Sequence, residues 1–309
     1  MSYIKVCGKQ IYYEEYGKSN SPTVVYMHGG PGESCLTYSY AAQKLGEKLH
    51  VISFDQYGVF RSDALDENSN ADVKYHVELI EQMRNALGIK SWIPLGHSFG
   101  GMLACLYASM FPESTDAVIY DCPMWSALYT ARAMANATLP YFEKNQIADK
   151  IKKCREILND SISPKEAFFT ALEILNMDEG LSKFCHVISK EQYEGYLDEH
   201  IPEPHVPNDC WTKYQTFQKK LFDSVDFYED YLPCIQKIHQ PQFLIVGEYD
   251  MTCGKDEIEW FKNHAKTGQV RIVKNSAHLS WFEHPDEYTK MIFDFIKKYG
   301  RENGIQKNF

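Results

Sequence analysis

The sequence predicts an α/β fold in which helices flank a mostly parallel β-sheet and a helical insertion interrupts the chain near its middle. Short runs of β-branched residues that end at glycine-containing loops alternate with segments of helical periodicity over residues 1–122. The same alternation resumes late in the chain. This alternation is typical of a parallel sheet covered by helices. With 309 residues, 44% of them hydrophobic, the chain is long enough to bury a sizeable core.

Six strands are expected before the insertion. The first two show period-2 patterning around a Gly-Lys turn, which indicates an antiparallel pair. The other four are short and apolar, as buried parallel strands are. Three helical segments connect them, and the last of these is rich in small residues. The strands are expected in 3–6, 10–17, 91–98 and 116–122 and at the start of the segments 23–30 and 50–58, which end in glycine-containing loops. The helices are expected in 41–49, 71–89 and 100–111.

The strand–helix alternation stops after the sixth strand. The residues that follow contain helical patterns, for example at 167–176 and 211–222, and no clear strand. The economical interpretation is one α/β core, 1–122 and 241–309, that carries a mostly helical cap of 123–240. After the cap, strands are expected within 242–250 and 269–278, around the apolar runs FLIV and VRIV, and helices in 256–265 and 286–300.

Charge and composition exclude several classes of function. The chain has 32 Lys and Arg against 42 Asp and Glu, and this net charge of −10 disfavours a nucleic-acid or anionic-membrane partner. No apolar run approaches the roughly 18 residues of a membrane span, and the N-terminus lacks the apolar segment of a signal peptide. The nine cysteines have no metal-ligand spacing, which indicates reduced, mostly buried thiols in a cytoplasmic protein. We expect no metal or other cofactor, and a monomer or small homo-oligomer.

The strongest chemical motif is Gly96-His97-Ser98-Phe99-Gly100, at the point where a predicted strand gives way to a helix. A serine at such a turn projects its hydroxyl from the sheet, and the flanking glycines relieve crowding. Phe99 opens the helix, so its N–H is expected to point toward an oxyanion formed at Ser98. Ser98 is therefore the candidate nucleophile, and Phe99 is a candidate oxyanion donor.

A serine nucleophile needs a base and an acid that orients this base. In a strand–turn–helix site of this kind the order along the chain is Ser, acid, His, with the acid and the His on loops after late strands. Asp250 follows the apolar run FLIV, and His278 follows VRIV. Asp256, His264 and His284 fit less well, because they lie within or beside predicted helices. The predicted triad is therefore Ser98, Asp250 and His278.

A third motif, His28-Gly29-Gly30-Pro31-Gly32, follows the strand TVVYM. Two adjacent glycines allow the backbone to pass close to a substrate. The Gly30 N–H is the candidate second oxyanion donor, and His28 is expected to brace the loop instead of acting as a base.

Together these motifs resemble the proline iminopeptidase family of α/β hydrolases, and the α/β-hydrolase pattern covers nearly the whole chain. The resemblance implies Ser98, Asp250 and His278 as the triad, Gly30 and Phe99 as the oxyanion hole, and the insertion as a cap that closes over the site. It also implies removal of an N-terminal residue, often proline, from a short peptide or small-molecule amide. The segments that carry the resemblance are HGGPG, DQYG…RS, GHSFGG, GEYD and SAHLSWFEHP.

Two positions depart from the family pattern. Phe60 replaces the second glycine of the family's DQ-x-G-x-G-x-S loop, which changes the loop's backbone freedom. Met251 stands where well-studied members carry an acidic residue that grips the α-ammonium of the substrate. Met251 cannot form that ion pair, and a buried ammonium without a partner is costly. The family pattern also has a second acidic residue in the cap, for which Asp223 and Asp226 are only loosely aligned substitutes. Other alternative carboxylates are Glu33, Glu199 and Glu203, although each also suits a solvated surface.

These departures leave three hypotheses open. The first is an aminopeptidase-like serine hydrolase that cleaves an amide after a small N-terminal residue. The second keeps the same machinery as an esterase, lactonase, thioesterase or amidase, because Met251 and the aromatic cap suit an acyl substrate. The third is a small-molecule receptor without turnover, which an intact triad disfavours. The candidate substrate contacts are Gly29, Trp125, Met251 and Glu203.

Overall fold

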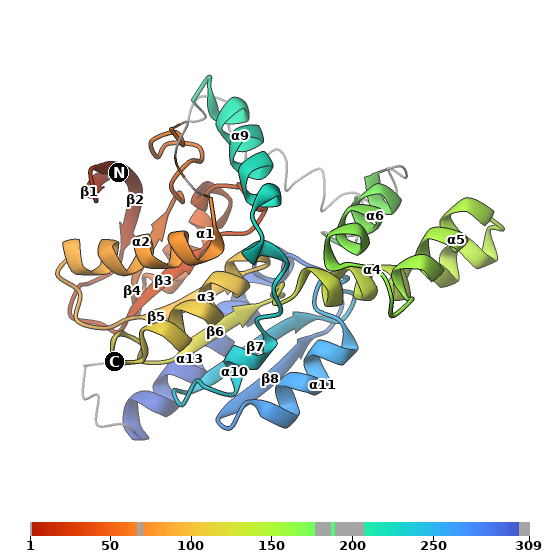
Figure 1. Ribbon diagram of the computed structural model, residues 1–309. Helices are drawn as coiled ribbons and strands as arrows, with labels where there is room; N and C mark the ends of the chain where they lie inside the picture. Colours follow the sequence, from red (N-terminus) through yellow and green to blue (C-terminus); the bar gives the residue numbers. More distant parts are fainter. Residues whose placement is uncertain (1, 67–68, 70, 177–186, 189–206, 303–309) are drawn as a thin grey trace.

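The computed structural model describes residues 2–66, 69, 71–176, 187–188 and 207–302 and contains an eight-stranded sheet flanked by helices (Figure 1). The strand order is β1-β2-β4-β3-β5-β6-β7-β8. The β1–β2 and β2–β4 pairs are antiparallel and all the other pairs are parallel, which confirms the predicted fold class. The strands are β1 (Ser2–Val6), β2 (Lys9–Tyr16), β3 (Thr23–Met27), β4 (His50–Phe54), β5 (Ile93–His97), β6 (Val118–Asp121), β7 (Gln242–Gly247) and β8 (Gly268–Val273).

Helices cover both faces of this sheet. Helices α1 and α13 pack on one face, and α2, α3, α10 and α11 pack on the other. Alternate residues of a strand therefore enter different cores. In β3, for example, Val24 and Tyr26 belong to the first core, whereas Val25 and Met27 belong to the second. These helices are α1 (Ser39–Leu45), α2 (Val73–Ala86), α3 (Phe99–Met110), α10 (Leu232–Ile235), α11 (Lys255–His264) and α13 (Pro285–Glu302).

Burial explains why the central strands carry so few polar residues. Every residue of β3, β4 and β5 is buried, because helices cover these strands on both faces. The helix expected in 41–49 is shorter in the structure, since α1 ends at Leu45 and Gly46 follows as its C-cap.

The strand order places a topological switch point at the carboxyl ends of β3 and β5. These two strands are neighbours, and the chain leaves β3 toward β4 on the opposite side from β5. Loops that depart in opposite directions open a crevice at such a switch point, which is where open α/β sheets bind ligands. The glycine-rich loop at 28–32 and the turn at Ser98 flank this position.

The described part of the insertion, between β6 and β7, is helical. Helices α4, α5 and α6 pack on one another around their own apolar cluster and project to one side of the sheet (Figure 1). Helix α9 contacts α6 through its C-terminal end, where the ring of Phe222 lies 5.7 and 5.5 Å from the rings of Phe168 and Phe169. The cap boundaries stay a prediction. The helices here are α4 (Ala127–Lys144), α5 (Ala148–Ile157), α6 (Pro164–Asn176) and α9 (Cys210–Asp223).

Helix α9 is attached to the loops that follow β3 and β4. Gln218 Nε2 donates to the Pro31 carbonyl oxygen at 3.0 Å, and Lys213 Nζ donates to the carbonyl oxygens of Phe60 and Ser62 at 3.0 and 3.1 Å. These cap side chains satisfy backbone acceptors of the core loops, so α9 and the loops form one unit at the carboxyl edge of the sheet.

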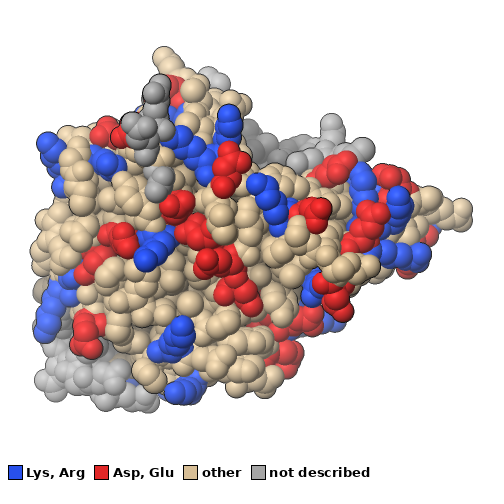
Figure 2. Space-filling model, in the orientation of Figure 1, with Lys and Arg blue, Asp and Glu red and all other residues tan. Residues whose placement is uncertain are grey.

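Surface charge and cysteine state agree with the sequence-based expectations for the described residues. Basic and acidic side chains are interspersed on the face drawn in Figure 2. The eight described cysteines are all free thiols, and six of them are buried. In the described part of the chain, no helix has the length and apolarity that a membrane crossing requires.

Candidate active site

Ser98 occupies a sharp turn between β5 and α3. Its φ of +54° is one that a side-chain-bearing residue rarely adopts, and the turn depends on small neighbours. A Cβ atom at Gly100 would lie 2.0 Å from the Met27 carbonyl oxygen, so only glycine fits beside β3. Ser98 itself is partly exposed, whereas Phe99 is fully buried. The turn therefore presents the Ser98 hydroxyl at the carboxyl edge of the sheet.

Backbone hydrogen bonds hold this turn in place. The Ser98 N–H donates to the Asp121 carbonyl oxygen at 3.1 Å, and the Ser98 carbonyl oxygen accepts from the N–H groups of Gly101 and Met124 at 2.8 and 2.9 Å. Phe99 is the first residue of α3, where backbone N–H groups have no partner within the helix. The Phe99 N–H therefore stays a candidate oxyanion donor.

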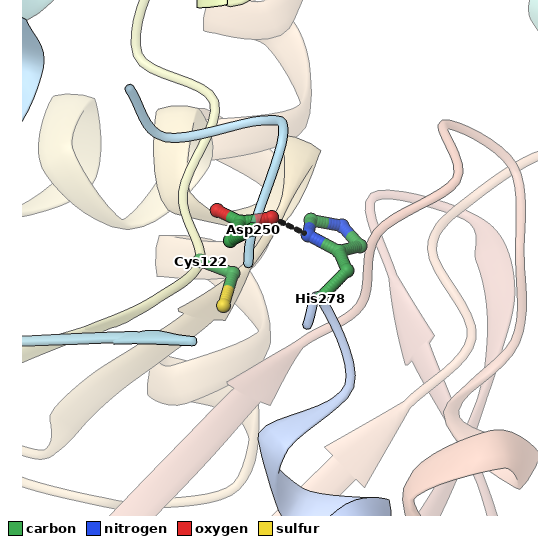
Figure 3. A group of neighbouring side chains, drawn as sticks. All are labelled: Cys122, Asp250 and His278. Carbon is green, nitrogen blue, oxygen red and sulfur yellow. Dashed lines mark hydrogen bonds and ion pairs between the residues drawn. The ribbon is translucent and has the colours of Figure 1, made fainter. Parts of the chain in front are cut away.

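Asp250 lies just beyond β7 with its carboxylate fully buried. Oδ1 accepts from the Thr252 N–H at 3.2 Å, and Oδ2 accepts from the Cys253 N–H at 2.9 Å. His278 Nδ1 lies 2.7 Å from Asp250 Oδ1 (Figure 3). The backbone therefore fixes the carboxylate, and the carboxylate fixes the orientation of the imidazole.

His278 follows β8, and its ring lies 4.7 Å, centroid to centroid, from the ring of His97. Because His97 directly precedes Ser98, the imidazole of His278 lies beside the serine turn. Burial lowers the pKa of His278, but the charge and hydrogen bond of Asp250 outweigh this effect and raise the pKa overall. Asp121 and Glu33 raise it further.

The sequence analysis missed a second buried carboxylate at this edge, that of Asp121. It is the last residue of β6, its side chain is fully buried, and its Oδ2 lies 2.9 Å from His97 Nδ1. Its Oδ1 has no hydrogen-bond partner among the described residues. The signal that singled out Asp250, an Asp at the end of an apolar strand, also occurs in the stretch VIYD and would have found it.

The loop at 28–32 reaches the serine turn through its first glycine. A Cβ atom at Gly29 would lie 2.9 Å from the Ser98 Cβ, so the backbone passes against the serine. His28 is fully buried, accepts from the Gln56 N–H through Nε2 at 3.1 Å and bonds the Gly29 carbonyl oxygen through Nδ1. Burial lowers its pKa. His28 thus braces the loop, as expected.

Comparisons with known proteins agree with this geometry. Residues 22–158 match the model of the alpha/beta hydrolase fold family. The proline iminopeptidase of Heyndrickxia coagulans is 24% identical over 95% of this chain and 97% of its own length. The chain has the α/β-hydrolase fold and is similar to the proline iminopeptidases over nearly its whole length. These similarities identify it as an enzyme of the hydrolase class.

Solved structures show that this fold is shared by several kinds of hydrolase. A proline iminopeptidase-related protein from Thermus thermophilus superposes with a TM-score of 0.73 at 20% identity, covering 96% of both chains. A variant of the meta-cleavage product hydrolase from Pseudomonas fluorescens superposes with a TM-score of 0.66 at 18% identity, covering 96% of this chain and 98% of that one.

The rival acid and bases lie elsewhere in the hydrolase. Asp256 is exposed in the first turn of α11. His264 bonds the Trp260 carbonyl oxygen within the same helix, and His284 bonds the Asn275 carbonyl oxygen.

The candidate substrate contacts are distributed differently from the sequence-based expectation. Trp125 is 0% exposed and stacks on Phe261 at 5.7 Å, so it belongs to the hydrophobic core of the hydrolase. Met251 is partly buried and packs against the apolar cluster of α4, α5 and α6. Gly29 lies against Ser98, as described above. Glu203, like Glu199, falls outside the described residues.

A cavity of about 750 Å³ lies next to Asp250, on the side of α4. Residues of α4, including Tyr129 and Ala133, line it together with Met251 and the start of α11. Neither Ser98 nor His278 lines it, so this cavity lies behind the acid and away from the serine turn.

Proposed function

We propose that this hydrolase removes a small N-terminal residue, such as proline, from short peptides or related amides through an acyl-enzyme on Ser98. The observation that carries the proposal is the 2.7 Å hydrogen bond between Asp250 and His278, formed beside the serine turn. Support also comes from the full-length similarity to a proline iminopeptidase.

The proposed mechanism uses these groups in order. His278 Nε2 accepts the proton of the Ser98 hydroxyl as the oxygen attacks the carbonyl carbon, and Asp250 stabilises the imidazolium that results. The N–H groups of Gly30 and Phe99 hold the developing oxyanion. His278 then returns the proton to the leaving amine, and water attacks the acyl-enzyme by the same route. The raised pKa of His278 favours the imidazolium.

In this proposal Glu33 holds the α-ammonium of the substrate, since Met251 has no charge. The Glu33 side chain lies next to the loop that carries Gly30, because a Cβ atom there would be 3.1 Å from Glu33 Cγ. Its negative charge contributes to raising the pKa of both His278 and Tyr214, so its field acts on the imidazole. Within the described residues its carboxylate has no hydrogen-bond or ion-pair partner, which leaves it available for a cation.

A second candidate function is hydrolysis of an ester, lactone, thioester or N-acylated amide. The observation that favours it is the packing of Met251 against the apolar cap cluster. This packing leaves an uncharged side chain next to the triad acid, where an acyl chain encounters no carboxylate.

A substrate panel distinguishes the two candidates. We expect the wild-type enzyme to hydrolyse proline and alanine arylamides, to lose this activity when the amine is acetylated, and to lose all turnover in Ser98→Ala. Glu33→Gln is expected to raise KM for the free-amine substrates by about 10–100-fold, the worth of a charged hydrogen bond, without changing ester turnover. The exposed Glu47 provides the matched control, Glu47→Gln.

Hydrolysis of acetylated amides or acyl esters in preference to free-amine substrates would support the second candidate and remove the role of Glu33. If a folded Ser98→Ala variant retained turnover, both candidate functions would be contradicted, because both use Ser98 as the nucleophile.

A further inference from the structure

One buried nucleophilic group at this edge has no part in the proposed mechanism. Cys122 follows β6, directly after Asp121, and adopts a φ of +43°. Its side chain is 0% exposed, and its thiol contacts the Ala277 carbonyl oxygen at 3.8 Å. The thiol is thus held between the end of β6 and the loop that carries His278.

Cys122, Asp250 and His278 form a compact group of three metal-ligating side chains. One ligand atom from each residue lies within 4.8 Å of the other two. Figure 3 shows the carboxylate and the imidazole facing one another, and the Cys122 side chain next to Asp250 with its sulfur turned away from the pair in this view. A thiolate, an imidazole nitrogen and a carboxylate oxygen are the ligand types that Zn²⁺ and Cd²⁺ prefer.

The distances between the three ligand atoms are close to those around a tetrahedrally coordinated ion. With bonds of about 2.0–2.3 Å, the ligand atoms around Zn²⁺ lie roughly 3.3–3.8 Å apart. Ligand atoms that already lie within 4.8 Å of one another reach this spacing by moving about 1 Å. The peptide N–H groups that bind the Asp250 carboxylate keep one ligand fixed while the other two adjust.

We propose that Cys122, Asp250 and His278 bind a thiophilic divalent cation, Zn²⁺ or Cd²⁺, and that the bound ion switches the hydrolase off. The Cys122 thiol gives its proton to solvent, and the ion takes the place of the proton between Asp250 and His278 Nδ1. The imidazole stays neutral by carrying its proton on Nε2 instead. His278 then has no lone pair to accept the proton of Ser98.

The charge around the group favours a cation. The Asp121 carboxylate is fully buried next to Cys122, and its Oδ1 has no hydrogen-bond partner among the described residues. Buried carboxylates with few donors gain from a nearby dication. The inhibitory effect rests on the proposed role of His278 as the base, whereas binding of the ion does not.

The test separates binding from activity. Cd²⁺ is titrated into the full-length enzyme while the ultraviolet charge-transfer band of a cadmium–thiolate bond is recorded, and Zn²⁺ inhibition is measured in parallel on the best substrate. We expect a one-to-one band and inhibition that a chelator reverses. Cys122→Ala is expected to keep turnover and to need at least about tenfold more Zn²⁺ for half-inhibition.

Cys253→Ala is the matched control, since Cys253 is another buried cysteine close to Asp250, and it is expected to behave as wild type. If Cys122→Ala does not fold, Cys122→Ser is used instead. In addition, the cadmium chemical shift of the wild-type enzyme shows whether sulfur is among the ligand atoms. An unchanged band or unchanged inhibition in a folded Cys122 variant would overturn the proposal, as would a cadmium signal without a sulfur ligand. If the enzyme shows no turnover, the band and the cadmium signal still decide whether the site exists.

Discussion

Asp121 ends β6, and Asp250 lies just beyond the neighbouring parallel strand β7. Both carboxylates are fully buried beside the two histidines. The two carboxylates have different hydrogen-bond partners, which indicates different roles. Asp250 bonds His278 Nδ1 directly and accepts two peptide N–H groups, whereas Asp121 bonds His97. A carboxylate bonded to the base orients it, while one farther away acts only through its charge. We therefore assign the acid of the proposed triad to Asp250.

This assignment predicts unequal effects for two isosteric changes. Asp250→Asn is expected to lower kcat by about 10³–10⁴-fold, because the amide favours the wrong tautomer of His278. Asp121→Asn is expected to lower kcat by no more than roughly tenfold, the factor that one pKa unit represents. Steady-state kinetics on the same substrate measures both values.

Circular dichroism of both variants serves as the folding control. A loss for Asp121→Asn as large as that for Asp250→Asn would mean that Asp121 takes part in orienting the base, and the assignment would be wrong.

At the scale of elements, Phe60 links a strained core loop to the cap. Its φ is +40°, the conformation that favours glycine, and glycine is the residue of the family pattern at this position. Its carbonyl oxygen accepts from Lys213, and its ring lies 6.3 Å from the ring of Trp211 on α9. The loop thus keeps the backbone geometry of glycine, and the phenyl ring adds a contact with the cap.

We predict that Phe60→Gly is more stable than Phe60→Ala, although both lose the contact with Trp211. The strain of a left-handed residue, roughly 1–2 kcal/mol, exceeds the extra backbone entropy of glycine, roughly 0.5–1 kcal/mol. Urea unfolding of the two variants gives the difference in free energy of unfolding. Equal stabilities, or a more stable alanine variant, would show that the loop is unstrained at this residue.

The elements themselves could be predicted from local pattern. Periodicity and glycine-containing loops located the strands and most helices, and the motif around Ser98 located the turn. The neighbourhood of Asp121 and Cys122 could not be predicted, because it depends on β6 and β7 lying side by side. The burial of Trp125 in the core could not be predicted either. It depends on a contact with Phe261, which is distant in the sequence.

At the scale of the whole molecule, a buried ion pair joins the loops after β3 and β4. Asp55 is fully buried and accepts from Arg61 Nε at 2.7 Å, from the Ser34 hydroxyl at 2.6 Å and from the Cys35 N–H at 2.9 Å. The Arg61 guanidinium also lies 3.8 Å from the centre of the Tyr12 ring. The pair therefore ties the start of the sheet to the loops that form the candidate site.

We predict that Asp55→Asn lowers the free energy of unfolding by about 1.5–3 kcal/mol at neutral pH, because the Arg61 guanidinium loses its charged hydrogen bonds to Asp55 and keeps Glu14 as its carboxylate partner. Burial raises the pKa of Asp55, but Arg61 and Ser34 outweigh burial and lower it overall. A lowered pKa stabilises the folded state above the unfolded value of about 4, and the gain is lost as the pH falls through the folded value.

The difference in free energy of unfolding between wild type and Asp55→Asn is therefore expected to be largest at neutral pH and to decrease below about pH 4. Urea unfolding at a series of pH values measures it. A gap that does not depend on pH would contradict an ionised Asp55 in the folded state.

Covalent labelling of Ser98 tests the proposed mechanism most directly. The wild-type enzyme is treated with a small fluorophosphonate, digested and mapped by mass spectrometry. The proposed triad predicts a single adduct on the peptide that contains Ser98, absent in Ser98→Ala and formed far more slowly in Asp250→Asn. An adduct on another residue that persists in Ser98→Ala, or no adduct on the folded wild-type enzyme, would contradict it.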